Sequence, residues 1–406
     1  MAVSGIGASD IISATVGGAT YGTTLLWALV LGAFFKFVLT EGLARWQLAT
    51  GTTLLQGWAL HLPRWVLHIF FGYLVLWSIA VSGALISGCG LAVENLTAGK
   101  ISFIAAALGQ ALIVFLFIQF AKSERSGIII KPLIAVMFIS VGGCAVLSFN
   151  DARALAAGLL VPSIPARGTA YVFSLIGGIG GSLTLLNYNY LLRDEGRVGA
   201  HALREVRIDL AIAYLFTAVF GLSVMLIAAR VFYFADVPIT DSEAVSRMAG
   251  QLANVTGPAG FYVYSIGFWA AVLASLIGVW QVVPHIFSDC WALLPGASRR
   301  DVAVSTAARP LSYTVALVFM AVAAVPFAFM QRPLLLVVAF TILGSLFIPF
   351  LAATLLYLNN LVPWPGAIEH NSTATNALLC AILLLFVAIG GFEVAALLGL
   401  TSAASH

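Results

Sequence analysis

The feature that most constrains this chain is a series of long apolar segments that recurs along almost its whole length. The ten segments cover residues 23–48, 65–91, 101–121, 130–149, 169–192, 209–234, 260–292, 310–330, 334–358 and 375–400. A helix that crosses a bilayer needs about 20 mostly apolar residues. The segments are far too long for the strands of a membrane barrel, and spanning backbone must satisfy its own hydrogen bonds. We therefore predict an all-α polytopic membrane protein.

The composition supports this prediction, because 61% of the 406 residues are hydrophobic and only 9% are charged. Soluble domains are closer to one-half apolar and one-quarter charged. A soluble enzyme and a nucleic-acid partner are therefore excluded, and the lipid bilayer is the expected surroundings. The sequence contains no phosphate-binding loop, zinc-protease motif or serine-elbow motif, so we expect neither catalysis nor a cofactor. Cys89, Cys144, Cys290 and Cys380 lie in apolar segments, where we expect reduced, buried thiols.

The basic residues between the segments indicate an orientation. One set of loops carries Lys122, Arg125, Lys131, Arg193, Arg197, Arg204, Arg207, Arg299, Arg300 and Arg309, and the alternate set carries Lys100, Arg153, Arg167, Arg247 and Arg332. Cytoplasmic loops are enriched in Lys and Arg. With residues 1–22 counted as a partial first span, the chain has about eleven spans, a cytoplasmic N-terminus and an external C-terminus. We expect a bacterial plasma membrane protein, for which a monomer is compatible with the sequence.

Two glycine-rich stretches interrupt the apolar pattern. The first, Gly5-Ile6-Gly7-Ala8-Ser9-Asp10, lies near the start, and the second, Gly177-Gly178-Ile179-Gly180-Gly181-Ser182-Leu183-Thr184, lies in the sixth span. Glycine destabilises a helix interior, and unpaired backbone at membrane depth is tolerated where it lines a cavity. Breaks five spans apart are typical of two inverted five-helix repeats with a binding site between them. Close helix packing at these glycines is the alternative interpretation.

Several motifs resemble those of the Nramp family of divalent-metal transporters. The resemblance rests on the stretches that begin at Ser4-Gly5-Ile6-Gly7, Gly17-Gly18-Ala19-Thr20, Glu41-Gly42-Leu43-Ala44 and Gly158-Leu159-Leu160-Val161. It is strongest to a divergent branch of the family, near the magnesium transporters. It implies a LeuT-like fold with alternating access, in which residues 1–150 form the first repeat, 151–360 the inverted second repeat and 361–406 an additional span.

The same resemblance implies where the metal site lies and how this chain departs from the family pattern. The first-helix motif Asp-Pro-Gly-Asn matches Gly7, Ala8, Ser9 and Asp10, so an acidic residue replaces the Asn and the first ligand is lost. The Met-Pro-His positions of the sixth helix match Gly181, Ser182 and Leu183. The later sixth-helix histidine, which the family associates with proton movement, falls near Tyr188.

Asp10 is the residue on which the predicted site depends. A carboxylate at membrane depth is costly and points to function, although Asp is also a preferred helix cap. We expect its partners to be Ser9, Ser182, Thr184, Asn187 and backbone carbonyls near Gly181. These are all oxygen donors, which suit Mg²⁺ or Mn²⁺. A small organic solute such as an amine or amino acid, or Na⁺ coupling, is the alternative because one carboxylate carries little charge.

Other ionisable residues within the spans require partners as well. Lys36 lies near the middle of its span, and Asp10, Asp209, Asp289 and Glu393 are its candidate partners. A structural ion pair is one interpretation of Lys36, and a charge that replaces a coupling ion is the other.

Two more pairs are spaced for contact along one helix. Glu41 and Arg45 are four residues apart and can pair on one helix face. His285 and Asp289 have the same spacing and suit a hydrogen bond at the helix end, a contact behind the metal ligands or a proton relay.

Two expectations concern the ends of spans. Residues 241–254 resemble a short surface helix between spans seven and eight. Nine residues before Asp10 reach about 13 Å as helix, so we expect either a longer natural N-terminus or a shortened inner gate.

Overall fold

The computed structural model describes residues 8–120, 123–148, 151–165, 168–197, 199–236, 244–295, 311–364 and 368–397, and it contains no strand within them. The first half comprises α1 (Ala8–Tyr21), α2 (Leu26–Thr50), α3 (Leu54–His61), α4 (Arg64–Leu96), α5 (Phe103–Phe120), α6 (Ser123–Ser148) and α7 (Ala152–Leu160). The second half comprises α8 (Thr169–Gly178), η2 (Leu183–Leu186), α9 (Asn187–Asp194), α10 (Ala200–Ala228), η3 (Ala229–Tyr233), α11 (Ala244–Thr256), α12 (Pro258–Leu293), α14 (Leu311–Met330), α15 (Pro333–Ser345), α16 (Phe347–Leu361) and α17 (Thr373–Leu397).

Each of the ten apolar segments coincides with a helix or a helix pair of the structure. Within the described residues, nine helical segments are long and apolar enough to cross a membrane, or ten if α6 and α7, which are bent by 115°, count as one. The 14-residue α1 corresponds to the partial first span. The all-helical polytopic fold is therefore confirmed, and α11 confirms the surface helix expected near residues 241–254.

The structure also departs from the expected elements in three places. Two short helices, α3 and α7, were not expected. A capping box forms α3, because Thr53 and Gln56 bond each other's backbone amides. The predicted span 334–358 is divided at Leu346 into α15 and α16. All four cysteines are free as expected, but Cys380 is exposed rather than buried.

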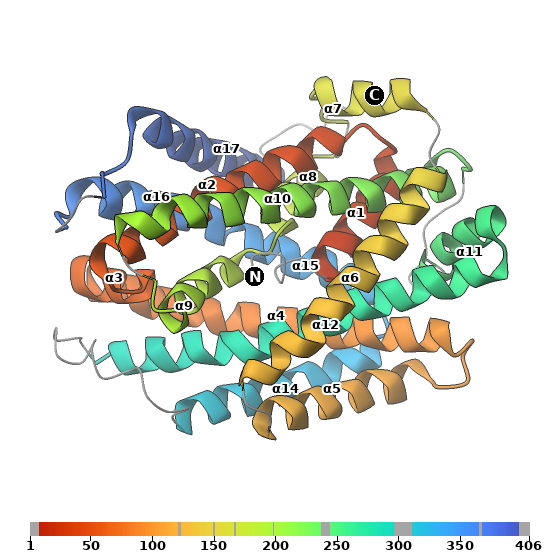
Figure 1. Ribbon diagram of the computed structural model, residues 1–406, viewed down its shortest axis with the longest axis horizontal. Coiled ribbons are helices and arrows are strands. Elements are labelled where there is room, and N and C mark those ends of the chain that lie inside the picture. Colours follow the sequence, from red (N-terminus) through yellow and green to blue (C-terminus); the bar gives the residue numbers. More distant parts are fainter. Residues whose placement is uncertain are drawn as a thin grey trace.

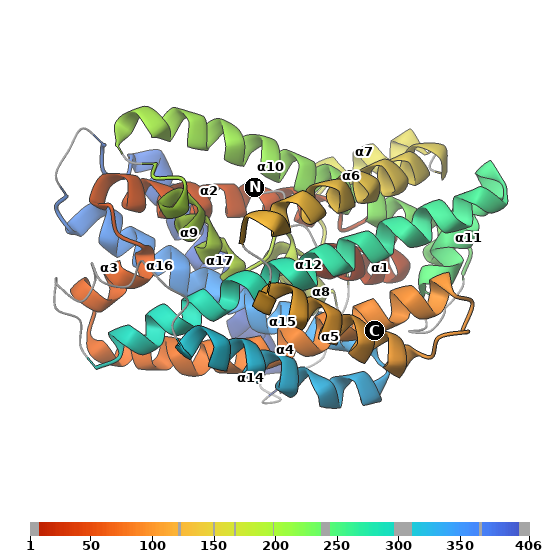
Figure 2. The same cartoon turned by 60° about the horizontal axis from the view of Figure 1, so that its bottom comes forward.

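The long helices run along the long axis of the molecule and enclose a central group of shorter ones. In both views α2 and α10 lie on one side and α4 and α14 on the other, with α1, α8 and α15 between them (Figures 1 and 2). Helix α1 packs against α10, α15 and α8, and α2 packs against α10 and α8. The second glycine-rich stretch begins at the end of α8, so the fold places its start among α1, α2 and α15.

Candidate functional site

The sixth span is broken where the glycine-rich stretch predicts. Helix α8 ends at Gly178, Ile179 is extended with φ −60° and ψ 133°, and regular α-helix resumes only at Asn187. Gly180 and Gly181 have φ of 67° and 76°, a left-handed conformation that residues with a Cβ rarely adopt. The conformational freedom of these two glycines therefore allows the chain to leave the helix at this depth.

Asp10 connects α1 to this break. Its side chain lies in the first described turn of α1 and is 1% exposed. The backbone amide of Gly180 donates a hydrogen bond of 2.7 Å to Asp10 Oδ1. In a continuous helix that amide would bond to the carbonyl four residues earlier. Asp10 therefore satisfies a donor that the break has released, and the structure brings the first and sixth spans together as predicted.

Lys36 of α2 reaches the same break from another side. Its side chain is fully buried, and its Nζ donates to the carbonyl oxygens of Gly177, at 2.8 Å, and of Gly181. The ammonium also interacts electrostatically with the Asp10 carboxylate. In the described part of the chain, no carboxylate oxygen lies within 4 Å of Lys36 Nζ. Backbone carbonyls therefore take the place of the expected structural ion pair. The described charged groups at the centre of this site are therefore one carboxylate, of Asp10, and one ammonium, of Lys36.

Hydroxyl groups surround the break, and the sequence did not identify them. Ser13 lies one turn after Asp10 on α1, and its buried Oγ has no hydrogen-bond partner among the described residues. A Cβ built on Gly178 would lie 3.5 Å from that Oγ, which places Ser13 beside the end of α8. The i, i+3 spacing from Asp10 was the available signal, because it puts both residues on one helix face.

On the opposite side, α15 holds α8 through hydroxyl contacts. Ser174 and Thr341 share a hydrogen bond of 2.7 Å, and Ser345 donates to the carbonyl of Phe173 at 3.1 Å. Behind Gly180 lies the ring of Tyr214, whose hydroxyl bonds Thr40 at 2.7 Å. The break is therefore fixed by α1, α2, α10 and α15.

The other predicted ligands have different positions. Ser182 is buried beside Gly344 of α15, and Thr184 is half-buried in η2. Asn187 begins α9, and its Oδ1 is buried without a hydrogen-bond partner within the described ranges. Ser182, Thr184 and Asn187 remain predicted ligands, whereas the carbonyl of Gly181 lies at the centre of the site, where it accepts from Lys36. Gly7 and the side chain of Ser9 lie outside the described residues, and so does the first glycine break at 5–7.

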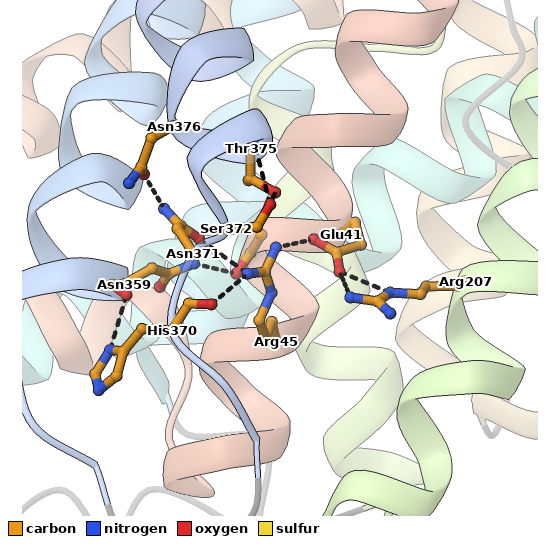
Figure 3. Close-up of polar contacts among 10 residues, drawn as sticks. Glu41, Arg45, Arg207, Asn359, His370, Asn371, Ser372, Thr375 and Asn376 are labelled. Atoms are coloured by element: carbon orange, nitrogen blue, oxygen red, sulfur yellow. Dashed lines mark hydrogen bonds and ion pairs between the residues drawn. The ribbon is translucent and has the colours of Figure 1, made fainter.

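Glu41 and Arg45 form the predicted pair, but they belong to a larger network. Arg45 Nη2 contacts Glu41 Oε2, and Arg207 of α10 donates to Glu41 Oε1 from Nε at 2.9 Å and from Nη2 at 2.8 Å (Figure 3). Arg45 also donates to Asn371 Oδ1 at 3.1 Å. These contacts connect α2, α10 and the segment before α17. The buried carboxylate of Glu41 therefore holds helices together and does not face the break.

Tyr188 and Asp209 meet as a pair away from the centre. The Tyr188 hydroxyl donates to Asp209 Oδ2 at 3.0 Å and joins α9 to α10. Asp209 also lines a pocket of about 420 Å³ together with Leu191, Glu195, Arg197, Glu205 and Ile208. Since Asp209 is committed to this contact, it is not a partner of Lys36.

His285 and Asp289 lie on one face of α12, next to α9. Asp289 Oδ2 is 3.7 Å from Nη1 of Arg193, whose guanidinium lies 4.9 Å from the centre of the Tyr190 ring. The His285 ring lies between those of Tyr190 and Tyr313, with centroids 6.2 and 4.5 Å away. The pair therefore belongs to an ion-pair and aromatic cluster at the end of the sixth span. Asp289 is engaged there and not by Lys36, and the side chain of Glu393 lies outside the described residues.

The donor chemistry of the centre is oxygen only. Across the described residues, no three His, Cys, Asp or Glu side chains approach closely enough to hold a metal ion together. Apart from the Lys36 ammonium, which cannot bind a cation, the described groups at the break are one carboxylate, backbone carbonyls and hydroxyls. Such groups are suited to hard cations and not to Zn²⁺ or Cu⁺, which favour imidazole or sulfur ligands.

A broken membrane helix whose freed backbone meets an acidic group from the first span is the arrangement typical of polytopic membrane proteins with a LeuT-like fold. The family model for natural resistance-associated macrophage protein-like (Nramp) sequences matches residues 1–396. This chain belongs to the Nramp family, as its motifs predicted.

Curated relatives and solved structures agree with this assignment. A "Divalent metal cation transporter MntH" of Pectobacterium carotovorum subsp. carotovorum is 24% identical over 272 residues, which are 64% of this chain and 63% of the relative. One from Deinococcus radiodurans is 23% identical over 268 residues, 64% of this chain and 60% of the relative. The chain thus matches a little under two thirds of these relatives' length.

Among solved structures, the Eremococcus coleocola manganese transporter in complex with an aromatic bis-isothiourea substituted compound gives a TM-score of 0.76 at 17% identity. The match covers 97% of this chain and 84% of that one. A mutant of the same transporter gives 0.73 at 17% identity and the same coverage. The likeness confirms the fold.

Proposed function

We propose that this protein transports a hard divalent metal cation, Mn²⁺ or Mg²⁺, across the bacterial plasma membrane by alternating access. The observation that carries this proposal is the hydrogen bond between Asp10 Oδ1 and the amide of Gly180, which places a buried carboxylate at a helix break. Broken helices with freed carbonyls at mid-membrane are where transporters of this architecture bind ions. The relatives, which are named divalent metal or manganese transporters, support the same substrate class.

The donor set favours an ion that keeps part of its water shell. One oxygen of Asp10, Ser13 Oγ and the carbonyls of Gly177 and Gly181 supply four of the six positions around Mg²⁺, an ion that commonly retains several waters in protein sites. Entry of a divalent cation would follow the membrane potential, worth about 2.3 kcal/mol per charge per 100 mV. We therefore propose uptake into the cytoplasm without an obligatory proton. The protein would need no cofactor or catalytic group for this.

The test is ion flux into proteoliposomes that contain the purified protein and an ion-sensitive dye. We expect Mn²⁺ or Mg²⁺ to enter, and Asp10→Asn to abolish the flux, because the site then has no anionic ligand. Asp151→Asn is the matched control, because it makes the same exchange at an exposed residue that caps α7, and it should retain flux. Wild-type flux rates in Asp10→Asn would remove Asp10 from the proposed site.

One observation favours a second candidate, a small organic amine. The break already holds an alkylammonium, that of Lys36, through two carbonyl oxygens. A substrate amine would be recognised by the same groups, with Asp10 as its counter-ion. A thermal-shift series separates the two candidates: stabilisation by amines or amino acids, without stabilisation by Mn²⁺ or Mg²⁺, would favour the organic solute.

A further inference from the structure

Lys36 is the one buried cation that the described residues place directly in the break. It lies near the middle of α2, is 0% exposed, and donates to the carbonyls of Gly177 and Gly181. A buried ammonium is costly unless it is fully hydrogen-bonded and balanced by opposite charge. Such a residue in the middle of a transporter is expected to have a function.

The two carbonyls that Lys36 contacts are ones that the break has released. In a continuous helix, Gly177 O would accept from the amide of Gly181, but that amide donates to Gly178 O at 3.2 Å. Likewise, Gly181 O would accept from Leu185, whose amide donates to Ser182 O at 3.1 Å. The ammonium thus occupies acceptors of the kind that coordinate ions in broken transporter helices.

Among the described residues, the charged group that acts on Lys36 is the carboxylate of Asp10. On α1 the Asp10 carboxylate accepts a hydrogen bond from the amide of Gly180, a residue that lies in the sequence between Gly177 and Gly181. On α10 the neutral hydroxyl of Tyr214 bonds Thr40, whose own hydroxyl donates to the backbone carbonyl of Lys36. From α8 and α15 the described groups that face the break are carbonyls and hydroxyls. A divalent cation that joined this arrangement would add two positive charges to described groups in which one ammonium already balances one carboxylate.

We propose that Lys36 is a tethered cation that competes with the transported ion, so that the ammonium and the divalent cation alternate on the carbonyls of the break. This inference rests on the proposed function and specifies how its site is regulated. The long, flexible stem of lysine lets the ammonium leave the carbonyls without movement of α2. When the ion leaves, the ammonium returns and satisfies the carbonyls, so that the empty site keeps its hydrogen bonds and its neutral charge.

The central experiment measures the concentration dependence of Mn²⁺ uptake in proteoliposomes for wild type, Lys36→Met and Lys36→Arg. Methionine keeps an unbranched side chain that is one atom shorter than that of lysine, and it removes the charge. We expect the KM for Mn²⁺ to fall by about tenfold or more in Lys36→Met, because repulsion between like charges at contact distance in a protein is large. The maximal rate should fall as well, since a tightly bound ion is released slowly. Lys36→Arg keeps the positive charge and should retain a KM at or above that of wild type.

Arg45→Met is the matched control, because it removes a buried positive charge from the same helix nine residues away. Arg45 contacts Glu41 and Asn371, not the break, so the KM of folded Arg45→Met protein for Mn²⁺ should equal that of wild type. A KM that is unchanged or raised in folded Lys36→Met, as judged by monodisperse elution and a cooperative thermal transition, would overturn the proposal. Lys36 would then be a structural clamp of the break.

A second measurement covers the case in which Lys36→Met does not fold. Lys36→Ala leaves space for a short primary amine, so methylammonium should compete with Mn²⁺ in this variant and not in wild type. Absence of that competition in a folded, Mn²⁺-transporting Lys36→Ala protein would also overturn the proposal. Failure of the underlying function has a different signature, namely that wild-type protein itself takes up neither Mn²⁺ nor Mg²⁺.

Discussion

At the scale of single residues, the site depends on groups that the break leaves without partners. Asp10 accepts from an amide that the broken helix releases, and Lys36 donates to two carbonyls that it releases. Ser13 is different, because its buried Oγ has no hydrogen-bond partner in the described part of the chain. Buried hydroxyls without partners are uncommon in folded proteins and call for an explanation.

Ser13→Ala distinguishes a ligand from a packing residue. If Ser13 Oγ binds the transported ion, the KM for Mn²⁺ should rise about three- to tenfold in Ser13→Ala. This is the effect expected when one neutral ligand that contributes about 1 kcal/mol to binding is lost. Stability should be unchanged, since no hydrogen bond is lost. Ser78→Ala is the control, because Ser78 Oγ on α4 is also buried without a hydrogen-bond partner among the described residues, but it lies on a helix that does not carry the break. Flux titrations and thermal unfolding would measure both, and equal KM values for the two variants would contradict a ligand role.

Gly177→Ala tests how closely α8 and α15 pack. A Cβ at this position would lie 1.7 Å from Ser345 Oγ and 2.9 Å from Ser345 Cα, so the two helices would have to separate. Overpacking of this kind costs about 1–3 kcal/mol. We expect a lower unfolding temperature in detergent. In Gly72→Ala, where nothing lies within 4 Å of the new Cβ, the temperature should not fall. Equal unfolding temperatures for both variants would show that α15 can shift without cost.

At the scale of elements, the network around Glu41 fixes α2 against α10 and the start of α17. Both carboxylate oxygens of Glu41 are engaged, by Arg45 and Arg207, and Arg45 continues to Asn371 (Figure 3). Arg207 is about half exposed, so part of the network is within reach of solvent. The network couples elements from both proposed repeats, and its loss should affect their packing more than the chemistry of the break.

Glu41→Gln should destabilise the fold, because removal of one partner leaves Arg45 as a buried and uncompensated charge. Breaking a buried pair in this way costs about 3–5 kcal/mol. Glu205→Gln is the matched control, since the Glu205 side chain is 71% exposed and lies 3.9 Å from Arg197, and exposed pairs contribute little. The unfolding temperature should therefore fall clearly in Glu41→Gln and change little in Glu205→Gln. A Glu41→Gln protein as stable as wild type would show that the network does not stabilise the fold.

At the scale of the whole molecule, the alternation of helices places the turn between α9 and α10 and the turn between α4 and α5 at opposite ends (Figure 1). The first carries Arg193 and Arg197, and the second carries Lys100. The excess of basic residues in the first set of loops predicts that it is cytoplasmic. The topology thus remains a prediction with a direct test.

Single cysteines at the two turns would establish the orientation. In a Cys380→Ser background, which removes the exposed native thiol, Lys100→Cys should react with a membrane-impermeant thiol reagent in intact cells. Gly196→Cys should react only after the membrane is opened. The reverse pattern would invert the proposed topology and place the N-terminus outside.

The sequence predicted the spans and the broken helix well, because these features are encoded locally. Apolar length is enough to indicate a membrane helix, and Gly177–Gly181 have too little helix propensity to continue one. It also indicated Asp10, since an isolated acid at membrane depth is conspicuous. It did not indicate α3 or the division at Leu346, where short capping motifs and local turns act within otherwise apolar sequence.

By itself, the sequence determined that the chain is a bundle of membrane helices, that the sixth span is interrupted, and that an acidic residue, Asp10, lies in the first span. Membrane backbone must bond within its own segment, so this information is local. The tertiary structure alone decided that Lys36 bonds carbonyls 141 and 145 residues away rather than a carboxylate, and that Arg207 joins Glu41 across 166 residues. Lipid is as apolar as the side chains, so the packing of whole helices, which no local pattern records, selects these partners.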